Sequence, residues 1–481
     1  MRTAERVGAL DASFLYAESR TTPMHVGSLA VLEVPESGFD YDLLLSLIAE
    51  RLGSARRFRQ KLRPVPGHLA APVWVDDDEF DLTYHVRRSA LPRPGTMAQL
   101  QELVARILSR HLDRHRPLWE MYLVEGLSDG RLAVLSKTHA AMVDGIAGVD
   151  LLSLLFDEAR AGDGNAPGSR TTWSPRPAPG APALVANAVV DWVRQPVRLA
   201  DAARSNVLHG LSSWRRVATA VGDVVGGAVG TIGGVATLAN PGPPPVSPLA
   251  VEVGQQRRIV TLRTSLEDYR KIRQRHGGTV NDVVLTVVAG AFRTWLLTRG
   301  EPVTASSAIR ALVPLAVRTQ DAARRPDSGI APAVIDLPIG EASAAVRLQH
   351  VRYETASHGA SPESVGAAVM TRLDGFAPAT LHAMSTRMIA GWGRRRFSTV
   401  VANVPGPQHP LFAAGARMLE VYPVIPLTSG TAVTIGVTSY DGALYYGLNG
   451  DRDAMPDLEV LAQCLEESLA ELLAVARSPV R

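Results

Sequence analysis

Strand-like and helix-like segments alternate along this chain, and this alternation constrains the fold more than any other feature. Residues 25–34 have the apolar and β-branched character of a buried strand. Residues 40–52 and 97–112 instead repeat apolar side chains at helical spacing, and residues 119–127 and 130–140 are again strand-like. A chain that mixes the two periods in this order is predicted to adopt an α/β or α+β fold.

The same alternation resumes in the second half of the chain. A strand-like segment from residue 257 leads into a helix that begins at a serine, and residues 279–300 form a strongly apolar helical pattern opened by Thr279 or Asn281. The elements expected after it are strands over 308–318 and 331–340, a meander over 411–452 with a hairpin turn at Asp441-Gly442, and a closing amphipathic helix over 455–476. Because the two halves share this order, we predict two similar domains.

A stretch rich in proline, glycine and serine separates the two halves. Residues 160–182 have this composition, which is typical of a linker or a mobile loop, and the prolines of 240–248 prevent a preceding helix from continuing. A length of 481 residues also exceeds that of one ordinary domain. We therefore predict an N-terminal domain over 1–160, a linker with connecting helices over 161–250, and a C-terminal domain over 251–481.

Within the linker, residues 217–239 carry a single charged side chain, Asp223. The segment is long enough for a transmembrane span, but six glycines and few large side chains make its insertion free energy poor. A second interpretation is a helix that lies against a lipid tunnel or the membrane face. We favour the third, a helix of small residues packed between domains.

Charge and cysteine content exclude several classes of protein. The net charge of +3 is small and not clustered, so we predict no nucleic-acid partner. The single cysteine, Cys464, forbids an intramolecular disulfide, and no Cys/His spacing typical of zinc proteins is present, so we predict no metal. The N-terminal segment lacks the apolar core of a secretory signal. We expect a cytoplasmic protein, with peripheral contact at the inner face of the membrane as an open alternative.

The segment most informative about chemistry is KTHAAMVDG, residues 137–145, which follows a strand and precedes a helix expected over 145–159. Acyl transfer from a thioester to a hydroxyl requires a base for the hydroxyl proton, donors for the tetrahedral oxyanion, and a dry channel that aligns donor and acceptor. A histidine at a strand-to-helix turn between two domains supplies such a base. A glycine after an aspartate allows the tight turn that aims it.

This segment resembles the HHxxxDG motif of the CoA-dependent acyltransferase superfamily. In that motif the second histidine, four residues before the aspartate, is the general base. The first histidine matches His139, while Asp144 and Gly145 match in place. The position of the base holds Ala140.

Further segments resemble the bacterial wax ester synthase/diacylglycerol acyltransferase family, and they occur in the family's order. They are the N-terminal signature over 10–33, the PLWE block over 116–127, the Asn-Asp helix over 281–296, the Asn-Val-Pro-Gly-Pro segment over 401–427 and the closing block over 439–452. His25 lies in the first of them and is interpreted as a core or strand-end histidine. Residues 327–332 depart from the pattern, because relatives carry a Gly-Asn pair there.

The resemblance implies two chloramphenicol-acetyltransferase-like domains, each a mixed β-sheet with helices, with the active site at their interface. It implies transfer of an acyl group from acyl-CoA, the substrate, to diacylglycerol or a long-chain alcohol, without a cofactor. Peripheral contact with a membrane or lipid droplet agrees with such substrates. No motif indicates a serine or cysteine nucleophile, which favours direct attack in a ternary complex.

The resemblance also assigns roles to individual residues. In the superfamily the aspartate that matches Asp144 pairs with an arginine and holds the turn, which Gly145 follows. Asn281 and Asp282 either cap a helix or line the substrate site. Asn403 is expected to satisfy backbone groups near the domain crossover.

Ala140 leaves three explanations open. The alanine is an engineered change at the base, or the chain is a natural relative that binds acyl-CoA or lipid without turnover, or proton transfer is assisted by substrate or water. His139 is one residue out of register and is expected to point to the opposite face, so we interpret it as structural. The predicted function is triacylglycerol or wax ester formation at a strongly reduced rate. The alternatives are a non-catalytic acyl-CoA or lipid carrier and an acyltransferase for a polyketide alcohol.

Overall fold

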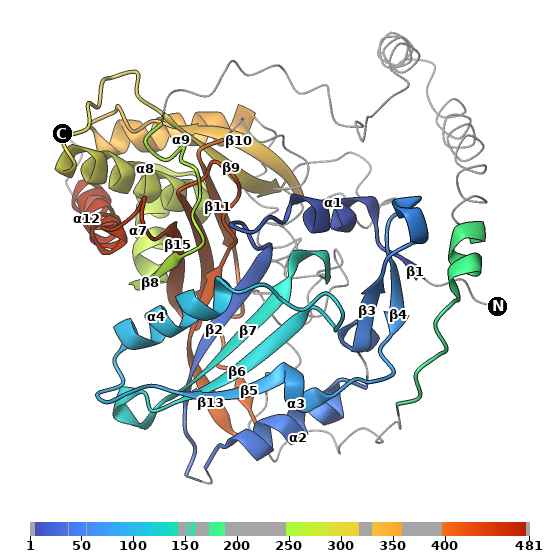
Figure 1. Ribbon diagram of the computed structural model, residues 1–481. Helices are drawn as coiled ribbons and strands as arrows, with labels where there is room; N and C mark the ends of the chain where they lie inside the picture. The colour runs from blue at the N-terminus through green and yellow to red at the C-terminus, as the bar shows by residue number, and fades with distance from the viewer. Residues whose placement is uncertain are drawn as a thin grey trace, which may run out of the picture.

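The computed structural model describes the chain over residues 5–36, 38–53, 55–142, 152, 155–158, 173–187, 247–316, 330–357 and 397–477. These residues form two six-stranded mixed β-sheets and one three-stranded sheet. The two large sheets lie against each other, and helices cover them on the outside (Figure 1). This arrangement confirms the predicted class, a mixed sheet with helices in each half.

The first large sheet has the strand order β12-β13-β2-β7-β6-β5. Its strands, in chain order, are β2 (His25–Glu33), β5 (Val86–Ala90), β6 (Trp119–Glu125), β7 (Leu132–His139), β12 (Phe412–Ala413) and β13 (Ala416–Val424). All eight residues of β7 are buried, because neighbouring strands flank it and other elements cover both faces of the sheet. Its first four residues are apolar, as a buried strand requires, and its last four, from Ser136 to His139, are polar although buried.

The strands β12 and β13 come from the last quarter of the chain, and β13 pairs with β2 from Arg417 opposite Glu33 to Val424 opposite Gly27. The predicted segment 251–481 therefore contributes strands to both large sheets. The boundaries of the three predicted segments stay a prediction.

The second large sheet has the order β10-β9-β11-β14-β15-β8. Its strands are β8 (Arg257–Ser265), β9 (Ile309–Ala316), β10 (Ile330–Leu337), β11 (Thr399–Val404), β14 (Val433–Tyr440) and β15 (Ala443–Asp451). The predicted hairpin turn joins β14 to β15, with positive φ at both Asp441 (43°) and Gly442 (80°). Two such residues in succession are the mark of a type I′ turn, whose twist suits a hairpin.

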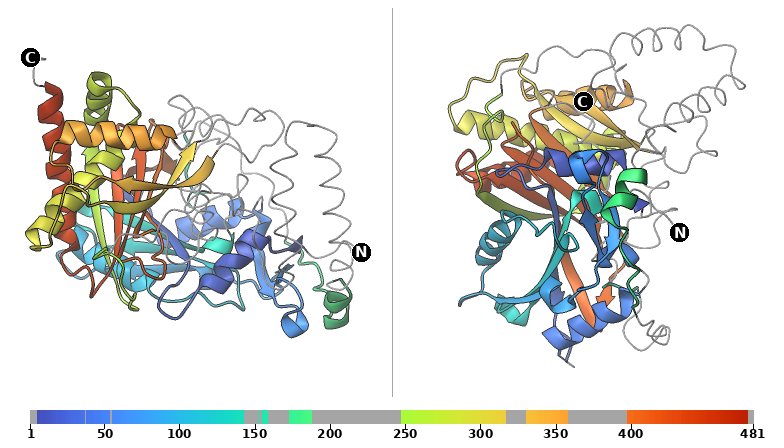
Figure 2. Two further views of the ribbon diagram at one scale, coloured as in Figure 1. Left: turned by 90° about the horizontal axis from the view of Figure 1, so that it is seen from above. Right: turned by 45° about the vertical axis from the view of Figure 1, so that its right-hand side comes forward.

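Four helices pack against the second sheet on the side away from the first sheet (Figures 1 and 2). They are α7 (Leu266–His276), α8 (Val280–Thr298), α9 (Ala344–Ser357) and α12 (Leu458–Arg477). Alternate strand residues separate two cores: Val313 and Tyr446 pack with these helices, whereas Leu312 and Tyr445 pack with the first sheet. The period of two along each strand thus joins both halves of the protein through one sheet.

The remaining elements surround the first sheet. The three-stranded sheet consists of β1 (Glu5–Arg6), β4 (Val73–Asp76) and β3 (Gln60–Arg63), and the helices are α1 (Ala9–Ala17), α2 (Tyr41–Arg51), α3 (Leu82–His85) and α4 (Met97–Leu108). Helix α4 begins with a Thr96–Gln99 capping box and lies between the first sheet and β8, where Gln101 Nε2 donates to Thr261 Oγ1 at 2.8 Å. It thereby bridges the two halves.

The helix expected over 145–159 is wrong at its described end. Residues 155–158 form a turn and a β-bridge in which Asp157 and Phe412 exchange both backbone hydrogen bonds at 2.8 Å. Backbone groups that pair with another strand are not available to a helix, and the Asp157 side chain bonds Arg51. Asp144, Gly145, most of the remaining residues of that segment and residues 217–239 lie outside the described residues.

Helix α8 is long and apolar enough to span a membrane, with a mean hydropathy of 1.4. However, 78% of that window is buried inside the protein, as in the core helix of a water-soluble fold. Thr279 caps its first turn, and Asp282 returns the bond to the Thr279 N–H at 2.7 Å. Of the two expected helix openers, Thr279 is therefore the cap.

Candidate active site

The turn that carries Ala140 is tied to two neighbouring segments by backbone hydrogen bonds. The His139 N–H donates to the Leu118 carbonyl and the Ala140 N–H donates to the Met24 carbonyl, both at 2.9 Å. Ala140 then opens a short 3₁₀ turn over Ala140–Met142, and its own side chain is fully buried. The PLWE block and the N-terminal signature thus hold position 140 in place.

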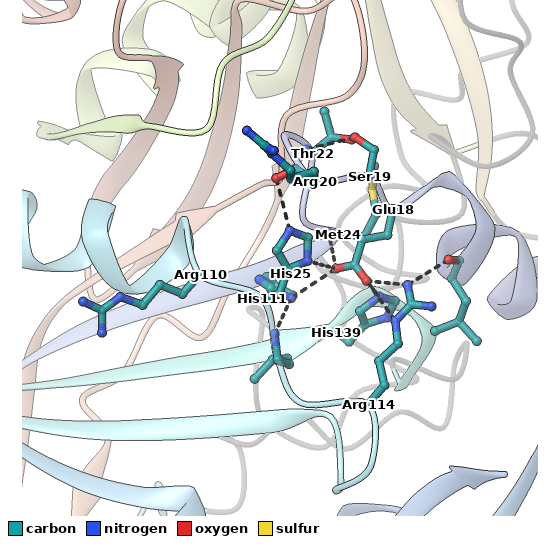
Figure 3. Close-up of polar contacts among 12 residues, drawn as sticks. Glu18, Ser19, Arg20, Thr22, Met24, His25, Arg110, His111, Arg114 and His139 are labelled. Atoms are coloured by element: carbon teal, nitrogen blue, oxygen red, sulfur yellow. Dashed lines mark hydrogen bonds and ion pairs between the residues drawn. The ribbon is translucent and has the colours of Figure 1, made fainter.

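His139 points its ring toward Glu18 and not toward solvent (Figure 3). The Ala141 N–H donates to His139 Nδ1 at 3.0 Å, so this nitrogen is the acceptor and Nε2 carries the proton. Nε2 lies 3.6 Å from Glu18 Oε2. With one nitrogen bonded to the backbone and the other facing a carboxylate, the ring has no free lone pair for an acceptor hydroxyl.

Glu18 is the centre of a buried polar cluster. Its Oε1 lies 3.4 Å from His25 Nε2 and 3.2 Å from His111 Nδ1, and Arg114 Nη2 donates to Oε2 at 2.5 Å. Burial alone would raise the pKa of the carboxyl, but the imidazoles of His139 and His25 and the Arg114 guanidinium beside it hold that pKa well below its usual range. Glu18 is therefore an anion at any physiological pH.

The histidine opposite His139 in the sheet is His25, whose ring centroid lies 5.9 Å from that of His139. Burial lowers the pKa of His25 to about 3, although Glu18 opposes the shift. The side chain is only 3% exposed and neutral. This placement agrees with the interpretation of His25 as a strand-end histidine.

Lys137 lies two residues before His139 on the same strand face, and it too is buried. Its Nζ donates to the Arg110 carbonyl at 2.6 Å and lies 3.5 Å from Glu120 Oε2. Burial lowers the pKa of Lys137 to about 8, because the low-dielectric surroundings disfavour the ammonium more than Glu120 favours it.

The candidate residues of the second half form a separate group. Asn403 on β11 donates through Nδ2 to Asn281 Oδ1 at 3.3 Å and so joins β11 to the start of α8. Asp282 accepts from the Thr279 N–H and, at 2.8 Å, from Thr355 Oγ1. Asp282 thus caps the helix and is fully engaged. Within the described part of the chain, no hydrogen bond or ion pair connects this group to Ala140.

The pattern along the sequence did not reveal Glu18, His111 and Arg114 as site residues. Of these three residues, only Glu18 lies within a segment that resembles the family, the N-terminal signature. Its position in that segment was the one available sign that it belongs to the site. His111 and Arg114 belong to a loop after α4 whose charges are typical of a solvated surface. Their approach to Glu18 depends on contacts across more than 90 positions.

Two family models match this chain. One describes the wax ester synthase/diacylglycerol acyltransferase catalytic domain and matches residues 7–284, and the other describes the C-terminal domain of the same family and matches residues 329–473. The chain belongs to the wax ester synthase/diacylglycerol acyltransferase family. The predicted family and the acyltransferase class are confirmed.

Relatives in this family cover nearly the whole chain. A probable diacylglycerol O-acyltransferase, tgs1, of Mycobacterium tuberculosis is 34% identical over 474 residues, which are 97% of this chain and 96% of that protein. The solved wax ester synthase/diacylglycerol acyltransferase from Marinobacter aquaeolei is 25% identical, with a TM-score of 0.64 and coverage of 98% and 99%. The first condensation domain of the calcium-dependent antibiotic synthetase shares the fold, at 15% identity, coverage of 99% and 98%, and a TM-score of 0.55.

Replacing His139 with alanine is expected to lower the free energy of unfolding by about 2–3 kcal/mol, because Ala141 and Glu18 lose their buried partner. Urea unfolding measures this change. His115→Ala, in an exposed part of the loop after α4, is the control and is expected to change stability by less than about 0.5 kcal/mol. If the two variants unfold with equal free energy, the interpretation of His139 as a structural residue is wrong.

Proposed function

We propose that this chain has the architecture of an acyl-CoA-dependent O-acyltransferase and that Ala140 strongly reduces its turnover. The acceptor is diacylglycerol, with long-chain alcohols as a second substrate class. The family membership supports the reaction class, and the names of the relatives support the acceptor. No cofactor is part of the proposal, since acyl-CoA is itself the substrate.

The contacts of His139 support the claim that turnover is strongly reduced. A general base must reach the hydroxyl proton of the acceptor within hydrogen-bond distance. The alanine methyl at position 140 has no proton acceptor, and both ring nitrogens of His139 are directed elsewhere. Attack on the thioester therefore proceeds without a positioned base, whereas a methyl group leaves room for substrate binding.

The same observation favours a second candidate function, a non-catalytic protein that binds acyl-CoA or lipid. The two functions separate in one assay, in which Ala140→His is incubated with radiolabelled acyl-CoA and either diacylglycerol or a long-chain alcohol. Labelled triacylglycerol or wax ester supports the acyltransferase. If Ala140→His forms no ester with any acceptor but still binds acyl-CoA, the result supports the carrier function and contradicts the acyltransferase function.

We also propose that the protein works in the cytoplasm and contacts a membrane or lipid droplet peripherally. Lipid acceptors of this class partition into membranes, so an enzyme that uses them must reach the lipid surface. Flotation with phospholipid vesicles that contain diacylglycerol tests the contact. The protein is expected to float with the vesicles and to remain at the bottom of the gradient without them.

A further inference from the structure

Three side chains with metal-ligating atoms converge beside the turn at Ala140. They are Glu18 after helix α1, His25 at the start of β2 and His111 after helix α4 (Figure 3). One ligating atom from each lies within 4.8 Å of the other two. The three residues come from separate segments of the chain, so no local spacing in the sequence indicates them.

The separations agree with a four-coordinate ion. Glu18 Oε1 lies 3.4 Å from His25 Nε2 and 3.2 Å from His111 Nδ1. Bonds of about 2.0–2.1 Å from zinc to nitrogen and oxygen, arranged as a tetrahedron, place neighbouring ligand atoms about 3.3–3.4 Å apart. The two imidazole atoms lie within 4.8 Å of each other, and an ion at the centre would draw them to that spacing.

The orientation of His111 is that of a metal ligand. Its Nδ1 faces Glu18, while Nε2 lies 3.3 Å from the Arg20 carbonyl oxygen. Histidines that bind metals commonly donate the N–H of their second nitrogen to a carbonyl or carboxylate, which fixes the tautomer and the ring plane. On His25, Nε2 lies 3.4 Å from Glu18 Oε1 and accepts a long hydrogen bond from the Leu112 N–H, also at 3.4 Å. Binding of an ion would turn the single lone pair of this nitrogen from the Leu112 N–H to the metal.

A second observation at this place comes from a residue outside the three proposed ligands. His139 is 1% exposed, and its Nε2 has no hydrogen-bond partner although it points toward Glu18 from 3.6 Å. Buried polar atoms are seldom left unpartnered, and a nearby ion or water molecule is one of the usual partners of such an atom. His139 therefore stands where it can hydrogen-bond a water molecule on such an ion.

We propose that Glu18, His25 and His111 bind one divalent ion of the zinc class. Two imidazole nitrogens and one carboxylate oxygen suit zinc, cobalt, nickel or copper better than magnesium or calcium, which prefer oxygen ligands. Three protein ligands leave a fourth position for water. This proposal departs from the prediction of no metal that the cysteine and histidine spacing suggested.

Nearby positive charges lower the affinity of this site for a metal ion, but they leave the proposed ligand atom, Glu18 Oε1, accessible to the ion. Arg114 binds Glu18 through the other oxygen, Oε2, at 2.5 Å, and Lys137 is buried on the same strand face as His139. Both cations repel a bound ion across a low-dielectric region. We therefore expect a site that a chelator empties readily, in contrast to closed sites built from thiolates.

The ion would act as a clamp beneath the turn that carries Ala140. The Met24 N–H donates to Glu18 Oε1 at 3.3 Å, and the Met24 carbonyl accepts from the Ala140 N–H. An ion on Glu18 would therefore fix the segment between α1 and β2 together with the loop after α4. The two backbone bonds transmit this constraint to position 140.

Cobalt titration of the untagged, full-length chain after removal of metal with EDTA tests the proposal. Tetrahedral Co²⁺ bound by nitrogen and oxygen gives a strong absorption band in the visible range. Zinc is expected to displace the cobalt ion and so to abolish this band. The unmodified chain is expected to reach saturation at one cobalt per chain. His111→Ala is expected to lose the band, whereas His115→Ala, in an exposed part of the same loop, is expected to keep it.

Thermal unfolding with and without zinc is the second readout, and neither readout depends on enzymatic activity. The His111 side chain is 40% exposed, so His111→Ala is expected to fold, and circular dichroism in EDTA checks this. Zinc should raise the unfolding midpoint of the unmodified chain and of His115→Ala, but not of His111→Ala. An unmodified chain without a cobalt band, or a His111→Ala variant that binds cobalt or gains stability equally, would overturn the proposal.

Discussion

Replacing Ala140 with histidine is expected to raise the rate of ester formation by about 10²–10⁴-fold, which is the usual contribution of a positioned base. The backbone at this position is already held by the bond from the Ala140 N–H to the Met24 carbonyl. A histidine there starts from the same Cα position at the beginning of the same 3₁₀ turn. The rate of labelled triacylglycerol formation at saturating acyl-CoA measures the gain.

Ala140→Gln is the matched control, since glutamine adds comparable volume and polarity but no base of suitable pKa. It is expected to leave the rate at the level of the unmodified chain. Because the Ala140 side chain is fully buried, the thermal midpoints of both variants must be compared with that of the unmodified chain. Equal gains for histidine and glutamine would contradict the role of a base at position 140.

Replacing Gly447 with alanine is expected to cost about 4 kcal/mol or more of the free energy of unfolding. A Cβ atom on this residue of β15 would lie 1.9 Å from the Pro423 carbonyl oxygen of β13. Both atoms belong to strand backbones, so neither can rotate away. Relief would require the two large sheets to separate where β15 and β13 meet.

Gly442→Ala is the control for the loss of a glycine in the same hairpin. Its φ of 80° is unfavourable for alanine, but nothing lies within 4 Å of the added atom. It is expected to cost about 1 kcal/mol. Urea unfolding compares the two variants, and a cost for Gly447→Ala no greater than that for Gly442→Ala would mean that the sheets do not meet as described.

Much of the fold was predictable because buried strands and amphipathic helices have different periods. The strand predicted over 25–34 is β2, and the helix predicted over 279–300 is α8, each within a few residues. The opposite orientation of His139 and residue 140, expected from strand alternation, stays a prediction, because β7 ends at His139 and Ala140 begins a 3₁₀ turn. These properties are local, and a sequence records local properties directly.

The remaining features depend on pairings between distant segments. Nothing local indicates that β13 would pair with β2, or that Asp157 would form a bridge with Phe412 in place of a helix. The cluster around Glu18 has the same character, since His111 reaches it from 93 positions away along the chain. Such contacts follow from the arrangement of the sheets, which periodicity does not specify.

The most direct test of the central claim is the binding of a nonhydrolysable long-chain acyl-CoA thioether to the unmodified chain and to Ala140→His. The claim is that the chain keeps the substrate site of its family and lacks only the base. Isothermal titration is therefore expected to give dissociation constants that agree within about threefold, or roughly 0.7 kcal/mol. Binding by Ala140→His without measurable binding by the unmodified chain, or no binding by either protein, would contradict the claim.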